Sequence, residues 1–290
     1  MARIFFTIVF YCFIIGACTA SEKHKVSDTV IPNEAETGNQ VCFNHSLIVL
    51  DSATYAEAVN SEFLSKFAFS FEKQLPGYQG FYLIGATNYL EFFHPESMEG
   101  EILEKGEIWI CLASLKANYL KGLSKEKLDF IEYKSDDHFN YLSLITEDSI
   151  NPITTWEMRK KQYESWTKKE YHDSISFSPV DYNSPQESDS SSNYLMNDVI
   201  GIGISLNTND SLKVINYLKE IGYDSYSEVN GFTRVSNNNQ FFELRIIEEL
   251  KSPMINRYFI QLNESIEPIT EIIGTSRVEC DGKLAIWYFE

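Results

Sequence analysis

The alternation of apolar and polar residues between positions 44 and 95 predicts one strand, a helix and three further strands. In the first strand a period of two places His45 on one face, and in the last strand it places Tyr89 and Glu91 on one face. The helix begins after Asp51, a typical N-cap residue, and its apolar residues recur at helical spacing. The stretch therefore predicts a βαβββ module.

A looser form of this module recurs three times along the chain. The second module begins at Gly106, and alignment of its helix cap with that of the first module places Glu107 at the position of His45. The third module begins near Ile200, and the fourth begins at Arg257 with a short helix expected over 266–274. One unit leaves a sheet face uncovered, whereas two units side by side enclose a cup. The predicted fold class is therefore α+β, with repeated βαβββ modules paired into two domains.

Between the second and third modules, the sequence predicts a helix from Thr154 to about His172, with Thr154 and Glu157 as a capping box. Basic and aromatic residues are interleaved along it, which fits a helix on a membrane or partner surface as well as one packed on the domain. A Ser- and Pro-rich stretch follows and marks a boundary. The predicted division is a signal peptide at 1–17, a flexible tether at 18–40, a first domain at 41–178, a linker at 179–196 and a second domain at 197–290.

The apolar run at 4–15 is typical of a signal peptide and is too short to span a membrane. It leads into Ile-Gly-Ala-Cys at 15–18, which resembles the bacterial lipobox and implies lipidation of Cys18. Ordinary secretion with cleavage near Ala17 or Ala20 is the alternative. A lipidated Cys18 would anchor the protein to a membrane of the cell envelope, periplasmic or at the cell surface, without a spanning helix.

The composition excludes some classes of function. The net charge of −18 argues against nucleic acid as a partner, because phosphate binding needs a basic surface. Cys42, Cys111 and Cys280 lack the spacing of a zinc cluster; an exported compartment permits a Cys42–Cys111 disulfide, and buried thiols are the alternative. The sequence carries no GxSxG, P-loop, GxGxxG or HExxH motif.

Three short motifs carry a resemblance to a known superfamily: Asn44-His45, Thr54-Tyr55 and the run Tyr-Leu-Glu-Phe-Phe at 89–93. With the closing strands, they make residues 41–290 similar to the glyoxalase or vicinal-oxygen-chelate superfamily. The likeness is strongest to a bacterial glyoxalase-related domain family of unknown function. The resemblance implies two glyoxalase-like domains, each formed by paired modules around a cup.

In metal-dependent members of that superfamily a divalent ion lies in the cup, bound by residues of the first and fourth strands. Carried over by position, the resemblance implies His45 and Glu91 as ligands, with Glu107 as a third, for zinc, manganese or iron. The alternative is a metal-free pair in which Glu91 is hydrogen-bonded to His45. Tyr55, Tyr89 and Trp109 are candidates to line the cup, with ordinary core packing as the alternative.

The other modules depart from this pattern. In the third module Gly201 stands at the histidine position, and Arg245 is expected to neutralise Glu243, so that no metal is expected there. In the second module Glu147 and Glu157 fit the fourth-strand glutamate poorly.

These residues favour an envelope lipoprotein whose first half binds a small molecule and whose second half is supportive. A metal-dependent lyase, isomerase or dioxygenase-type enzyme is one alternative. A non-catalytic envelope scaffold is another.

Overall fold

The computed structural model describes residues 40–100, 102–123, 128–134, 140–146, 152–183 and 193–289. By its internal contacts, Asn39–Glu290 forms one compact unit. The predicted signal peptide, the lipidation site Cys18 and nearly all of the predicted tether lie outside the described residues. Within the described residues, no helix is long and apolar enough to cross a membrane.

The first module has the predicted order of elements, with its helical part divided in two. Ser61 ends the first helix, and its side chain accepts a hydrogen bond from Leu64 N, so that a second helix begins there. Asp51 caps the first helix in the same way, accepting from Thr54 N at 2.9 Å. The elements are β1 (Val41–Val49), α1 (Ser52–Asn60), α2 (Glu62–Phe67), β2 (Phe69–Leu75), β3 (Tyr78–Ile84) and β4 (Tyr89–Met98).

The second module corrects the prediction for residues 154–172. A strand runs through the first part of that stretch, and a shorter helix follows it. The elements are β5 (Ile108–Ser114), α3 (Tyr119–Leu123), β6 (Leu128–Lys134), β7 (Asn140–Thr146), β8 (Ile153–Met158), α4 (Lys160–Thr167) and the 3₁₀ helix η1 (Pro179–Tyr182). The module is thus a complete βαβββ unit, with β8 as its fourth strand.

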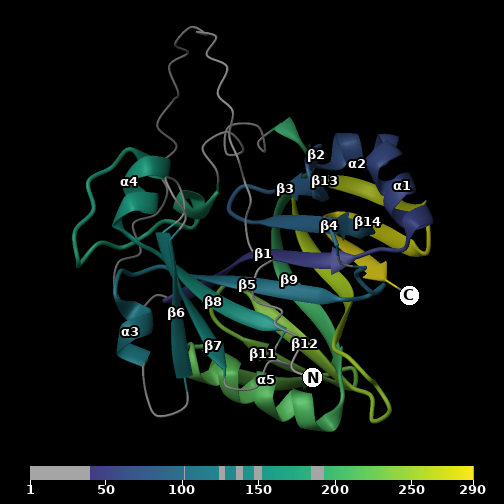
Figure 1. Ribbon diagram of the computed structural model, residues 1–290. Coiled ribbons are helices and arrows are strands. Elements are labelled where there is room, and N and C mark those ends of the chain that lie inside the picture. The colour runs from purple at the N-terminus through teal and green to yellow at the C-terminus, as the bar shows by residue number, and fades with distance from the viewer. Residues whose placement is uncertain are drawn as a thin grey trace, which may run out of the picture. The chain divides into compact units, whose positions relative to one another are not determined.

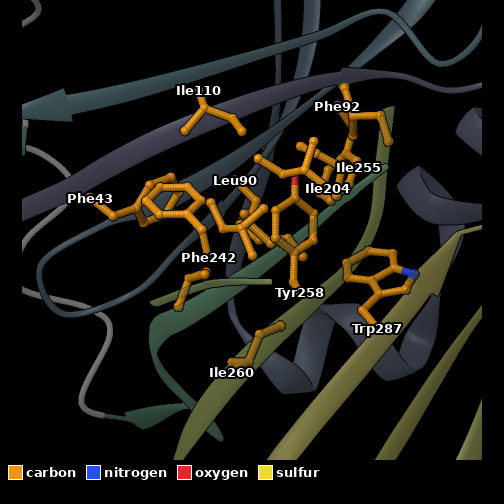
Figure 2. Close-up of a cluster of buried hydrophobic side chains, with 14 of the residues drawn as sticks. Phe43, Leu90, Phe92, Ile110, Ile204, Phe242, Ile255, Tyr258, Ile260 and Trp287 are labelled. Atoms are coloured by element: carbon orange, nitrogen blue, oxygen red, sulfur yellow. The ribbon is translucent and has the colours of Figure 1, made fainter. Parts of the chain in front are cut away.

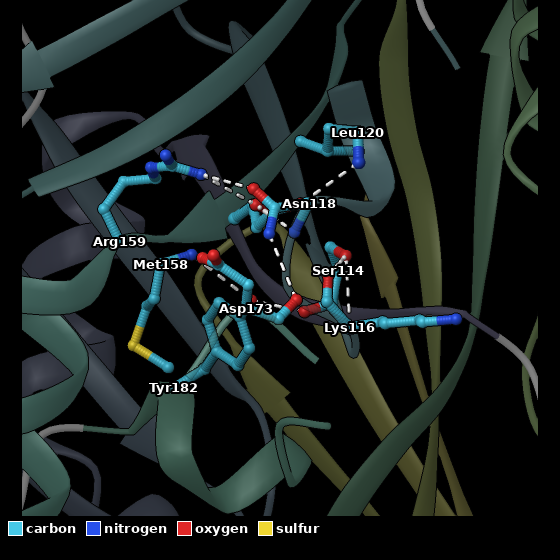
Figure 3. Close-up of polar contacts among 9 residues, drawn as sticks. Ser114, Lys116, Asn118, Leu120, Met158, Arg159, Asp173 and Tyr182 are labelled. Carbon is cyan, nitrogen blue, oxygen red and sulfur yellow. Dashed lines mark hydrogen bonds and ion pairs between the residues drawn. The ribbon is translucent and has the colours of Figure 1, made fainter. Parts of the chain in front are cut away.

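Glu157 explains why the capping-box prediction was wrong. This glutamate of β8 is fully buried and accepts hydrogen bonds from Asn118 N at 2.9 Å and Leu120 N at 3.1 Å, at the start of α3. Burial raises the pKa of Glu157, while these N–H groups and Arg159 favour its charged form. Figure 3 shows Arg159 and Asn118 at this junction. The glutamate therefore stabilises the start of another helix, α3, and not of its own segment.

The first two modules pair into one eight-stranded sheet, in the order β2-β3-β4-β1-β5-β8-β7-β6. β1 is parallel to β4, β5 is parallel to β8, and the two modules meet where β1 and β5 run antiparallel. Figure 1 shows β1, drawn in purple, beside β5. We call this sheet with its helices the first half.

The second half is a six-stranded sheet in the order β10-β11-β12-β9-β13-β14. Its last two strands are a long antiparallel hairpin with no helix between them, so the predicted fourth module with a helix over 266–274 is wrong. The elements are β9 (Met196–Leu206), α5 (Thr208–Glu220), β10 (Ser225–Val229), β11 (Phe232–Ser236), β12 (Phe241–Ile246), β13 (Met254–Ile273) and β14 (Ser276–Phe289).

One hydrophobic core joins the two halves. Figure 2 shows Leu90 and Phe92 of β4 meeting Tyr258 of β13 and Trp287 of β14. Ser46 Oγ lies 2.7 Å from the Tyr258 hydroxyl within this core. The helix-bearing face of the first sheet is therefore covered by its own helices and by the second half, while its other face carries His45.

The predicted linker at 179–196 is packed where it can be described. Tyr182, in η1, is 1% exposed and donates a hydrogen bond to Ser114 O. Met196 opens β9 and is fully buried. The division of the chain into two domains stays a prediction.

Candidate functional site

His45 and Glu91 point to the same face of the eight-stranded sheet, from neighbouring strands. In the parallel pair of β1 and β4, His45 is opposite Tyr89 and Leu47 is opposite Glu91. The two side chains thus lie on one face, two residues apart along the strand direction, as the alternation predicted. Below, a row means the side chains of that face that lie opposite one another across the strands. We call this surface the His45 face; its central residues are His45, Leu47, Tyr89, Glu91, Trp109 and Cys111.

His45 is held rigidly as a neutral imidazole. It is 5% exposed, its ring stacks on Tyr89 with centroids 4.7 Å apart, and its Nδ1 lies 2.7 Å from Asn44 Oδ1. Burial lowers the pKa of His45 from 6.5 to about 3. Since the amide oxygen can only accept, the proton is assigned to Nδ1, and Nε2 is the acceptor nitrogen of the ring.

Glu91 is 6% exposed and lies opposite Tyr82 in β3. Cys111 lies opposite His45, on β5. Burial, and secondly the negative charge of Glu91, raise the pKa of the Cys111 thiol well above its ordinary value. Cys42, Cys111 and Cys280 are all free in the structure. The His45 face therefore combines an imidazole, a carboxylate and a protonated thiol.

A series of stacked rings leads across the sheet to His45. Phe71 of β2 stacks on Tyr82 with centroids 5.0 Å apart, and Tyr82 lies 6.3 Å from Tyr89, which stacks on His45. Sequence reasoning missed Phe71 and Tyr82. They belong to the face because β2 and β3 continue the same register, with Phe71 opposite Tyr82 and Tyr82 opposite Glu91.

Glu107 lies farther along the sheet from His45 than Glu91 does. Its carbonyl accepts from Val49 N, two residues beyond Leu47 along β1. At about 3.3 Å per residue, its row is about 13 Å from that of His45. Among the residues that the structure describes, no group of three or more His, Cys, Asp or Glu side chains is gathered closely enough to hold a metal ion. His45 and Glu91 are donors of the kind that a divalent ion accepts, and within the described residues no third such side chain joins them.

The three predicted ligand-lining aromatics do not lie together. Tyr89 and Trp109 are on the His45 face, and Trp109 is half-buried opposite Leu47. Tyr55 belongs to the helix-side core, where its hydroxyl donates to Glu72 and its ring meets His94 edge-on. The prediction that Tyr55 shares the site is therefore corrected, because a residue of α1 packs on the opposite face.

The equivalent positions of the second half carry different chemistry. In the parallel pair of β9 and β12, Gly201 is opposite Phe241 and Gly203 is opposite Glu243, matching the register of His45 and Glu91. Gly201 thus occupies the histidine position, as expected. Glu243 is neutralised by Arg234 and Arg257, and not by Arg245, which is exposed on β12.

Comparison with known proteins gives one family match. Residues 43–289 match the model of DUF5829, a family of unknown function. No curated protein matches. Among solved structures, one similar chain is the crystal structure of a putative dioxygenase from Bacillus subtilis, with 13% sequence identity and a TM-score of 0.30; the match covers 70% of this chain and 61% of that one.

Proposed function

Since the chain belongs to DUF5829, a family of unknown function, we propose that it is a glyoxalase-like protein that binds a small molecule on the His45 face. The strand order supports the architecture. Two βαβββ units, each with parallel first and fourth strands, join through antiparallel first strands, as the resemblance of the sequence implied. The second half would then be a second glyoxalase-like domain with an incomplete final module.

The observation that carries the proposal is the fixed, neutral His45. Burial of a neutral imidazole costs less free energy than burial of a charged one. The hydrogen bond to Asn44 and the stacked ring of Tyr89 fix the orientation of the imidazole ring. Such a group accepts a hydrogen bond from a ligand hydroxyl or enol, while Tyr89 and Trp109 offer flat apolar surface. This arrangement is present in the first half, whereas the second half has glycine at the corresponding position.

A ligand screen with one variant tests this assignment. Fragments containing carbonyl or enol groups are expected to raise the melting temperature of the wild-type protein. A ligand at about 100 times its Kd adds about 2.7 kcal/mol to the free energy of unfolding. His45→Gln should lose these shifts. His172→Gln, a change at an exposed histidine, is the matched control and should keep them. Equal shifts in His45→Gln and wild type would remove His45 from the site.

The second candidate is a metal-dependent enzyme, favoured by the imidazole and carboxylate on neighbouring strands. A divalent ion bound there would polarise a substrate oxygen. Titration with Zn²⁺, Mn²⁺ or Fe²⁺ separates the candidates: binding lost in both His45→Gln and Glu91→Gln supports the enzyme. If neither fragments nor metals bind, the non-catalytic scaffold is the hypothesis that remains.

We further propose that the protein is an exported lipoprotein of the cell envelope, supported by the leader and the cysteine at position 18. Expressed in a bacterial host with labelled palmitate, the wild-type chain is expected to incorporate label and to sediment with membranes. Cys18→Ser should abolish the labelling, and Cys12→Ser, in the apolar run, should retain it. Labelling that persists in Cys18→Ser would contradict the assignment.

A further inference from the structure

The open face of the six-stranded sheet carries two arginines that share one glutamate. Glu243 of β12 is 2% exposed and lies between Arg234 of β11 and Arg257 of β13. Arg234 donates through Nε, at 3.1 Å, and Nη2 to Glu243 Oε1, and Arg257 donates through Nη2 to Glu243 Oε2. Both guanidinium groups are therefore fixed in place by the same carboxylate.

Aromatic rings lie under both arginines. The guanidinium carbon of Arg257 lies 4.2 Å from the ring centre of Phe232 and 5.1 Å from that of Phe259, and Arg234 lies 4.2 Å from that of Phe241. Such contacts hold a planar guanidinium against a planar ring. We call these two arginines, Glu243 and the three phenylalanines the arginine face.

The two glycines of β9 allow this packing. A Cβ on Gly201 would lie 2.3 Å from the ring of Phe241, and one on Gly203 would lie 2.6 Å from Cγ of Arg257. The phenylalanine and arginine therefore lie directly on the backbone of β9. The position of His45 in the first half is thus taken by an aromatic ring in the second, and that of Leu47 by an arginine side chain.

The charges of the arginine face do not cancel. Two arginines and one glutamate leave a net charge of +1, in a protein of net charge −18. Arg257 Nε is buried and has no hydrogen-bond partner among the residues that the structure describes. Each guanidinium carries five N–H donors, and Glu243 engages only some of them. A buried donor without an acceptor is costly, so this cluster is completed best by one more anionic group.

We propose that the arginine face is a binding site for a small organic anion of the aromatic carboxylate class. A carboxylate matches the planar fork of a guanidinium, and the phenylalanine rings accept a flat apolar body. The side chain of Arg234 is 32% exposed and that of Arg257 19%, so part of each arginine is within reach of solvent, although Arg257 Nε is buried. This site is separate from the His45 face and does not depend on the function proposed for it.

Titration with benzoate, followed by amide NMR of the full chain, tests the site. Benzoate is expected to shift the amide resonances of Gly201 and Gly203, and benzamide, which has the same ring without the charge, is not. Arg234→Gln and Arg257→Gln should each weaken binding by about tenfold or more, the loss expected for a charged hydrogen-bonded pair. Lys251→Gln removes one exposed charge from the second half and should change the affinity by less than about twofold.

Two further variants keep the test decisive if the glutamine variants fail to fold. Arg257→Lys keeps the charge but loses the fork, and should weaken benzoate binding measurably. Glu243→Gln removes the competing carboxylate and should strengthen it. The proposal is overturned if Arg257→Lys binds as the wild type does, if benzamide binds as well as benzoate, or if about 10 mM benzoate, enough to fill a millimolar site, shifts neither glycine amide. Shifts confined to the His45 face would also overturn it.

Discussion

Replacement of Trp287 by alanine is expected to lower the free energy of unfolding by about 4 kcal/mol, the middle of the range for losing a buried aromatic ring. Trp287 is fully buried, and its ring centre lies 4.9 Å from that of Phe92 in the other sheet and 5.3 Å from that of Phe289. Its indole Nε1 donates to Ser276 Oγ at 2.9 Å. The variant loses the ring at the junction of both halves and leaves a buried hydroxyl with one partner fewer.

Urea unfolding followed by fluorescence and circular dichroism measures this loss. Trp109→Ala is the matched control, because Trp109 is half-buried on the His45 face and its removal opens a site already in contact with water. It should cost less than half as much. A Trp287→Ala protein as stable as Trp109→Ala would show that the two halves do not share a core.

The module order could be predicted because one face of each strand is buried. Where apolar and polar residues alternate, as in β1 and β9, the period of two gave both the strand and the face on which each side chain lies. The same alternation placed His45, Tyr89 and Glu91 on one face, and the register of β1 and β4 confirmed it.

Two helix predictions were wrong because the same local sequence pattern occurs both in helices and in strands. Thr154 and Glu157 have the spacing of a capping box, yet Glu157 caps α3, which lies far earlier in the sequence. Residues 266–274 mix isoleucine with glutamate at helix-like spacing, but 266–273 belong to β13, which pairs with β14 as half of a hairpin. Long-range pairing decided both cases, and a single sequence does not show the partner.

The prediction that Arg245 neutralises Glu243 was wrong for the same reason. Arg245 was the arginine nearest in sequence on the predicted face, whereas Arg234 reaches the carboxylate from the neighbouring strand β11 and Arg257 reaches it from β13, across β9. Tyr55 is the opposite case: its place next to the superfamily motif suggested a ligand, but a helix lies on the covered face of the sheet. Neighbours across strands, and not along the chain, define both surfaces.

The second large effect is expected at Asp198, where the two halves are joined. Asp198 Oδ1 accepts hydrogen bonds from Thr87 N at 2.7 Å and Asn88 N at 3.2 Å, in the turn between β3 and β4. Asn88 binds Val199 N and O with its side-chain amide. Burial raises the pKa of Asp198 to about 6, although these backbone donors favour its charged form.

The sign of the pH dependence follows from this raised pKa. Between about pH 4 and pH 6 the folded protein binds more protons at Asp198 than the unfolded chain does, so stability falls as the pH rises. The shift from 3.8 to about 6, reduced for partial exposure of the side chain, corresponds to about 2 kcal/mol. Cys42 is a titratable neighbour: its pKa is raised by burial and by the charge of Asp198, so its thiol is protonated throughout this range.

Asp198→Asn removes the titration and keeps an oxygen that can accept from Thr87 and Asn88. Relative to the wild type, this variant should gain about 2 kcal/mol of stability between about pH 4 and pH 7, measured by urea unfolding at each pH. The ¹³C resonance of the Asp198 carboxyl supplies an independent measurement and should titrate near pH 6. A midpoint below that of an unperturbed aspartate would reverse the sign, because the backbone donors would then outweigh burial and the junction would weaken in acid.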